Sequence, residues 1–95
     1  MAIYRTPLGF QALTVTSGAA VALTVPAAAN MAVISVENNS IRTRDDGTNP
    51  TTTVGFLVFP GNSIELQSLT VLNATKFIAV DATDATLSIQ YYQQQ

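Results

Sequence analysis

The chain has 95 residues and a formal net charge of −2; charged residues make up 11% of it and apolar residues 47%. This length fits a single domain, and so large an apolar share excludes an intrinsically disordered chain. The sequence has no cysteine and no histidine, which excludes disulfides and thiolate metal sites and removes the commonest metal ligand and the usual general base near neutral pH.

So few charges leave a surface of Thr, Ser, Asn, Gln and Ala, which loses little hydration free energy when another protein covers it. Four basic residues are too few to follow a phosphate backbone, so we expect no nucleic-acid partner. No apolar run reaches the roughly 18 residues of a membrane-spanning helix, so we expect no membrane partner. The opening MAIYRTPLGF lacks the basic flank and apolar core of a signal peptide, so we expect a protein that is used without secretion.

Residues 1–9 include a proline and a glycine and show no apolar period, which predicts an extended N-terminal arm. The β-rich runs at 10–16 and 20–25 predict the first two strands, and a proline that cannot donate to a ladder ends the second. The segment 26–30, PAAAN, predicts a turn, because the run that follows it at 31–37 alternates and is β-branched, as in a strand.

A period of two continues into SIRTR, where Arg42 and Arg44 share one face and Ile41 and Thr43 share the other. The run at 53–59, TVGFLVF, is apolar on both faces. It therefore predicts a central strand that is covered on both sides.

The rest of the chain is predicted to contain a turn at 60–63, a strand through 64–66, a break at 73–75, strands at 76–80 and 85–92, and a disordered tail at 93–95. No segment offers two clean turns of an amphipathic helix, and about eight strands with turns at roughly 8–12-residue spacing are typical of a sandwich or barrel. We predict one domain over 10–92, an all-β antiparallel two-sheet sandwich that is jelly-roll-like, with a small closed barrel as the alternative.

The stretch SIRTRDDGTNP holds two of the four basic and two of the six acidic residues. One interpretation is a cation site, with Asp45, Asp46 and Asn49 as the hard oxygen ligands that calcium prefers. The spacing differs from that of an EF-hand loop, and an Asp-Gly dipeptide readily adopts the positive φ of a turn, so we favour a turn without metal. Arg42 and Arg44 are expected to pair with Asp45, Asp46 or Glu37.

Other candidate sites are weaker. Asp81 and Asp84 could act as a carboxylate pair in glycoside cleavage, but they lie in a polar turn. Tyr91 and Tyr92 with Tyr4 could form a stacking platform for sugars or bases, although a terminal tyrosine pair more often places one ring in the core and one at a rim. No Ser-His-Asp, Cys-His or metal-ligand set can be assembled, so we expect no enzyme, no cofactor and no metal.

The segments LTVPAAANMAVISVENNSIRTRDDGTNPTTTVGFLVFPGNSIEL and KFIAVDATDATLSIQYY resemble a group of small all-β proteins from tailed bacteriophages and prophages. The resemblance covers roughly residues 10–92, and its most specific part is RTRDDGTNPT. The matching residues are Val25, Pro26, Glu37, Arg42, Arg44, Asp45, Asp46, Gly47, Thr48, Pro50, Thr51 and Gly55. Members of the group are mostly interpreted as virion structural proteins, so the resemblance implies a particle component and names no active residue.

We therefore expect a bacteriophage virion structural protein that is assembled in the host bacterial cytoplasm, most simply a capsid decoration or cement protein. Its partners would be the major capsid protein or another virion protein, and further copies of itself, with a trimer favoured. The alternatives are a tail, neck or head-fibre-base component and a carbohydrate-binding module for host attachment. The residues expected to make contacts are Tyr4, Arg5, Leu8, Phe10, Arg42, Arg44, Asp45, Asp46 and Tyr92.

Overall fold

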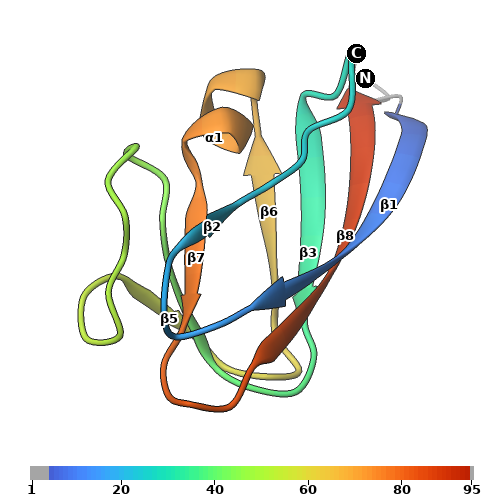
Figure 1. Ribbon diagram of the computed structural model, residues 1–95. Coiled ribbons are helices and arrows are strands. Elements are labelled where there is room, and N and C mark those ends of the chain that lie inside the picture. Colours follow the sequence, from blue (N-terminus) through green and yellow to red (C-terminus); the bar gives the residue numbers. More distant parts are fainter. Residues whose placement is uncertain (1–4, 95) are drawn as a thin grey trace.

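Residues 5–94, the part of the chain that the computed structural model describes, form two antiparallel sheets of four strands and one short helix (Figure 1). The elements in chain order are β1 (Arg5–Val15), β2 (Val21–Ala22), β3 (Met31–Val36), β4 (Ile41–Arg44), β5 (Phe56–Val58), β6 (Ser63–Gln67), α1 (Leu69–Ala74), β7 (Lys76–Ala79) and β8 (Ala85–Gln94). The predicted all-β architecture with two antiparallel sheets is confirmed.

The strands are ordered β1-β8-β3-β6 in one sheet, sheet A, and β2-β7-β4-β5 in the other, sheet B. In the middle of sheet A, Ile34 of β3 lies opposite Ile89 of β8, and in sheet B Thr43 of β4 lies opposite Phe77 of β7. The most distant parts of the sequence are neighbours, because β1 pairs with β8 along most of its length. The two described ends of the chain therefore lie side by side (Figure 1).

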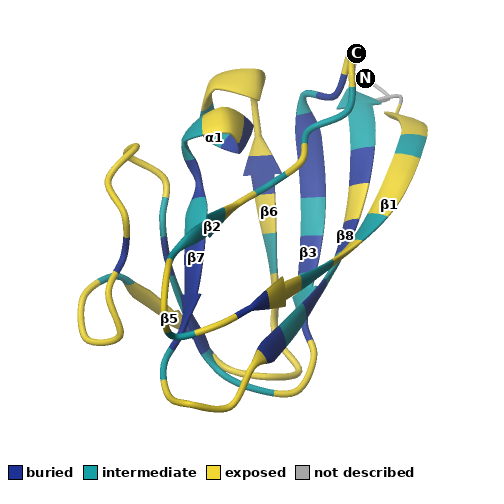
Figure 2. Cartoon of the chain, viewed as in Figure 1, coloured by how far each residue is buried: buried dark blue, intermediate teal, exposed yellow. Residues whose placement is uncertain are grey.

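The core lies between the two sheets. From Ala85 to Tyr91, every second residue of β8 is buried, which is the period of two expected of a strand with one covered face. Figure 2 shows the same alternation as bands along β8. Buried core residues from both sheets and the connections are Val15, Ala29, Ala32, Ile34, Val36, Ile41, Val58, Leu66, Leu72, Phe77, Ala79, Ala85, Leu87, Ile89 and Tyr91.

The predictions for the two ends of the chain differ from the structure. Residues 5–9, expected in an extended arm that precedes the domain of residues 10–92, belong to β1, and Arg5 lies opposite Gln94. Gln93 and Gln94, expected in a disordered tail, belong to β8 for the same reason. Each end of the chain supplies the other with backbone hydrogen-bonding partners. The sequence alone does not show which strands pair, so this arrangement could not be predicted from it. Residues 1–4 and Gln95 lie outside the described residues.

Helix α1 was not predicted from the sequence, which indicated a strand broken at 73–75. Ser68 begins the helix, because its hydroxyl accepts a hydrogen bond from the Val71 amide at 3.2 Å. Leu72 lies in the core and anchors this single turn between β6 and β7. Within residues 5–94, no helix has both the length and the apolar character needed to cross a bilayer.

Candidate functional site

The two arginines of β4 hold the long loop that leads from β4 to β5. Arg42 donates from Nε to the carbonyl of Thr52 at 3.1 Å and from Nη1 to the carbonyl of Gly55 at 2.9 Å. The expected pairing of Arg42 with a carboxylate is therefore wrong, since its guanidinium binds two backbone carbonyls instead. This pair of bonds fixes the end of the loop, and with it the start of β5, against β4.

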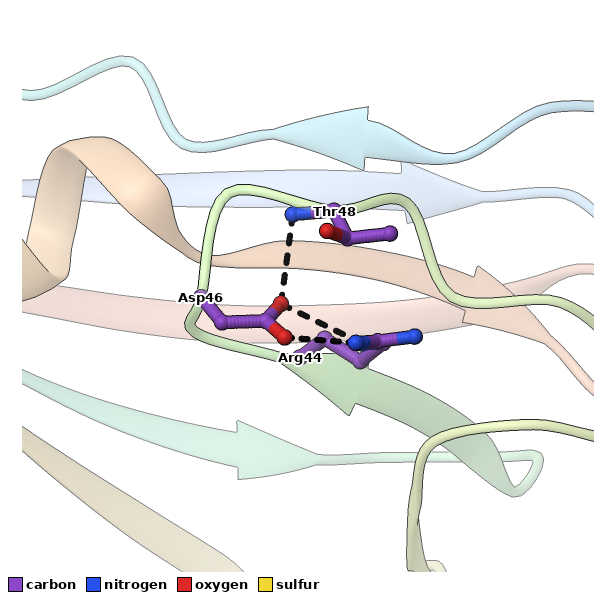
Figure 3. Close-up of polar contacts among 3 residues, drawn as sticks. All are labelled: Arg44, Asp46 and Thr48. Carbon is purple, nitrogen blue, oxygen red and sulfur yellow. Dashed lines mark hydrogen bonds and ion pairs between the residues drawn. The ribbon is translucent and has the colours of Figure 1, made fainter.

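Arg44 holds the beginning of the same loop (Figure 3). Its Nε and Nη2 donate to Oδ1 and Oδ2 of Asp46 at 3.2 and 2.5 Å, and the Thr48 amide donates to the same Oδ1 at 3.2 Å. The hydrogen bond from Arg44, and then that from Thr48, holds the pKa of Asp46 below its ordinary value. The predicted pairing of Arg44 with a neighbouring carboxylate is confirmed.

The turn interpretation of Asp45-Asp46-Gly47 agrees with this geometry. Gly47 has a φ of +83°, the left-handed backbone that an Asp-Gly dipeptide was expected to supply. Both carboxylate oxygens of Asp46 accept hydrogen bonds from the protein. Among residues 5–94, no group of three or more Asp or Glu side chains lies close enough together to hold a metal ion.

Gly55 allows the loop to lie directly on β4. Its φ is +138°, and an added Cβ would lie 3.2 Å from the Cβ atoms of both Arg42 and Pro50. Any side chain at this position would be strained by the backbone and would push the loop away from Arg42. The glycine, the two arginines and the Asp-Gly turn thus form one structural unit, which explains why these residue types occur together in the sequence.

The unit borders an open cleft of about 600 Å³ between the edges of β5 and β6. Its apolar lining residues are Val54, Phe56, Ile64 and Leu66, and its charged ones are Arg44, Asp45, Asp46 and Glu65. β5 ends sheet B and β6 ends sheet A, so both strands that flank the cleft have one edge unpaired within residues 5–94.

The strand that borders this cleft is the main departure from the prediction. The run at 53–59 was expected to form a central strand, whereas β5 has three residues and lies at the edge of its sheet. Phe56 is 79% exposed, Phe59 55%, Val54 52% and Leu57 42%. We call these four residues the β5 patch; Figure 2 colours this part of the chain largely as exposed. A run that is apolar on both faces predicts coverage, but the sequence does not say whether the same chain provides it.

Four other predicted contact residues lie in or near sheet A, away from the β5 patch. The Arg5 guanidinium lies 5.9 Å from the centre of the Tyr92 ring and 3.7 Å from Oε1 of Glu65. Phe10 is 62% exposed on β1, and Leu8 is partly buried against the core. Tyr4 lies outside the described residues. The structure therefore brings together Arg42, Arg44, Asp45 and Asp46 as one group, and it places Arg5 and Tyr92 in another.

Tyr91 and Tyr92 have separate environments. The Tyr91 side chain is in the core, where burial raises its pKa to about 12, and its hydroxyl donates to Oε1 of Gln11 at 2.5 Å. The hydroxyl of Tyr92, at the rim, donates to Oε1 of Gln90. One ring in the core and one at a rim was the expected arrangement, and it removes Tyr91 from any stacking platform.

Asp81 of the proposed carboxylate pair stabilises a turn. Its Oδ1 accepts hydrogen bonds from Nδ2 of Asn39 and from the Thr83 amide, both at 2.9 Å. Asp84 contributes its backbone carbonyl, which accepts from Nδ2 of Asn38 at 3.2 Å. These bonds connect the loop after β3 to the loop before β8.

The comparisons with known proteins name no family for this chain. A scan against protein-family models gives no match, and a search of curated proteins gives none either.

Proposed function

We propose that this protein is a structural subunit of a bacteriophage particle, most simply a capsid decoration protein that acts through protein–protein contacts. The observation that carries the proposal is the β5 patch, where four large apolar side chains are exposed on a domain with few charges. Exposed apolar clusters on small proteins mark interaction sites, because covering them removes apolar surface from water.

A second surface with few charges lies on the outer face of sheet A, where Arg5 and Glu65 pair at 3.7 Å. There Phe10 lies opposite Gln90, Ala12 opposite Ser88, and Thr14 opposite Thr86. Small uncharged side chains of this kind are inexpensive to desolvate, so this face suits broad contact with a neighbouring shell subunit. A subunit with two such surfaces can connect its neighbours, as a cement protein must.

The fold itself is proposed to be a jelly roll. The strand orders β1-β8-β3-β6 and β2-β7-β4-β5 support this, because the chain passes from one sheet to the other at every connection between strands except that from β4 to β5. Jelly rolls are common among viral capsid and lectin domains. The lectin function receives less support, since Tyr91 is in the core and Arg5 lies over the ring of Tyr92.

In this proposal the RTRDDGTNPT stretch has a positioning role. Arg42, Arg44 and Gly55 hold the loop and so present β5 at the edge of sheet B. The stretch then serves the geometry of a contact surface.

Localisation of the chain in intact particles by cryo-electron microscopy tests the proposal. We expect it on the outside of the shell in hundreds of copies, and particles without it should lose their genome at a lower temperature. About six or twelve copies at the tail or neck would contradict the decoration role while keeping a structural one. Absence from purified particles, together with specific binding on a glycan array, would contradict the whole proposal.

A further inference from the structure

The four edge strands of the two sheets differ in how well they are protected from pairing with another chain. β1 contains a bulge between Pro7 and Gly9, β2 has only two residues, and β6 carries Glu65 and packs beside α1. Charges, prolines, bulges and short length are the usual protections of an edge. β5 is also short, with three residues, but it is the edge strand that lies within a cluster of large exposed apolar side chains, and the chain carries no charged residue between Asp46 and Glu65.

We propose that two copies of this chain associate through β5, with the free edge of β5 in one copy pairing antiparallel with β5 of the other about a twofold axis near Leu57. A twofold axis brings a strand against itself in the opposite direction, so an antiparallel pair is the arrangement that the symmetry requires. The two B sheets would then form one continuous sheet. The inference concerns the protein on its own and does not rest on the proposed function.

Charge favours a second copy as the occupant. Two identical surfaces repel each other where they carry like charges, and the β5 patch has none. Of the two acidic residues of the loop, Asp46 is paired with Arg44 of the same chain, and Asp45 lines the cleft beside β5. The β5 patch carries no charge that would select a basic or an acidic partner. The β5 patch of a second copy is equally apolar, and its strand has the same length.

The area sets the strength of the association. Side chains of this size and exposure present roughly 400 Å² of apolar surface per copy, and edge pairing covers only part of it because Phe56 and Leu57 point to opposite faces of the sheet, so two copies bury less than about 800 Å² in total. Stable interfaces start at about 1,200 Å² in total, so the dimer should be weak, with a Kd in the micromolar range. The outer face of sheet A, with Phe10, stays free in this dimer.

A cysteine crosslink tests the axis directly, because the natural chain has no cysteine. In Leu57→Cys, two copies paired near this residue bring their Cα atoms to about 4.5–5.5 Å, within the range of a disulfide. We expect mild oxidation to give a covalent dimer at protein concentrations above the Kd. The matched control is Phe10→Cys, also on an exposed edge strand, which should stay largely monomeric under the same conditions.

Charge substitution tests the energetics. Sedimentation equilibrium of the full chain from about 1 μM to about 1 mM should show a shift from the mass of one chain to the mass of two. Phe56→Lys should weaken the dimer at least about tenfold, since two like charges are brought to the edge, and Phe10→Lys should leave it unchanged. Circular dichroism checks that both variants are folded. We expect both to fold, because Phe10 and Phe56 are largely exposed and contribute little to the core.

A protein that stays monomeric at about 1 mM would overturn the inference and leave β5 to a different protein. A mass of three chains would overturn it in favour of the trimer expected from the sequence. Equal crosslinking of the two cysteine variants would also overturn it. None of these results touches the particle location, so the inference and the proposed function can fail separately.

Discussion

The β1–β8 pair and the β4–β5 pair use their apolar side chains in opposite ways. β1 and β8 pair along nearly all of their length, and alternate residues of β8 lie in the core. β5 pairs with β4 over three residues only, and Phe56 and Leu57 remain exposed. The first pair provides cohesion within the domain, and the second provides surface for association. Apolar content alone does not distinguish these two uses.

The supports of the two regions differ as well. β8 is held by packing, with a side-chain hydrogen bond from Tyr91 to Gln11, whose Oε1 also accepts from the Thr24 amide at 3.2 Å. β5 is held mainly by the hydrogen bonds of Arg42 to the loop before it. Substitutions in the β1–β8 pair should therefore lower the free energy of unfolding. Substitutions in the β4–β5 pair should mainly loosen the backbone of β5 and of the loop before it.

The largest effect is expected in the core. Leu87→Ala removes a fully buried side chain that lies opposite Leu13 and should lower the free energy of unfolding by about 2–5 kcal/mol. A domain of this size has on the order of 5–14 kcal/mol in total. Urea denaturation followed by circular dichroism measures the loss. A loss below about 1 kcal/mol would show that this half of the sandwich is loosely packed.

Arg42→Ala should have the next largest effect. It removes two charge-assisted hydrogen bonds to the carbonyls of Thr52 and Gly55, and we expect a loss of about 2 kcal/mol with faster amide exchange confined to the loop between β4 and β5. Hydrogen exchange measured by mass spectrometry gives both the size of the increase in amide exchange and the segment in which it occurs. Arg42→Lys, which keeps the charge but not the two-pronged geometry, should recover only part of the protection. Faster exchange spread over sheet A would contradict a local role.

Tyr91→Phe should cost about 1 kcal/mol at neutral pH through the lost hydrogen bond to Gln11. Burial raises the pKa of Tyr91 from 10.0 to about 12 in the folded protein, so stability from this group is complete below pH 10 and is lost as the pH rises from about 10 to 12. We expect the urea midpoint of the natural protein to fall in that window more steeply than that of Tyr91→Phe. Parallel curves for the two proteins would count against a buried, neutral Tyr91.

Phe56→Ala should have the smallest effect on the single domain, within about 0.5 kcal/mol, because Phe56 is largely exposed. The measurement must be made well below the Kd of the proposed dimer, so that association does not contribute to the measured stability. A loss as large as that of Leu87→Ala would mean that Phe56 contributes to the core and would remove the contrast between the two regions.

Most of the fold could be predicted from residue periodicity. The runs that became β3, β7 and β8 alternate or are β-branched, and the turns at 26–30 and 60–63 follow proline, glycine and asparagine. The two chain ends and α1 could not be predicted, since their structure depends on partners distant in the sequence. Leu72, for example, fits a strand as well as a helix until the sheets form a core for it to enter.

The candidate site was predicted less completely. The residue types of the Asp-Gly turn indicated a positive φ, and Gly47 has it. The partners of Arg42 could not be predicted, because backbone carbonyls are present at every position and leave no mark in a sequence. The exposure of Phe56 was missed for a related reason: an apolar side chain has the same chemistry whether its neighbours come from its own chain or from another.

The pairing of the first and last strands has a kinetic consequence. β8 is the sole neighbour of β1 in sheet A, and β3 has β6 as its other neighbour, so β1 has no partner until β8 has left the ribosome. Contacts between residues so far apart in sequence make folding slow, in the range of about milliseconds to seconds. Before β8 is made, the nascent chain therefore exposes β1 and one edge of β3, and unpaired strand edges of this kind favour aggregation.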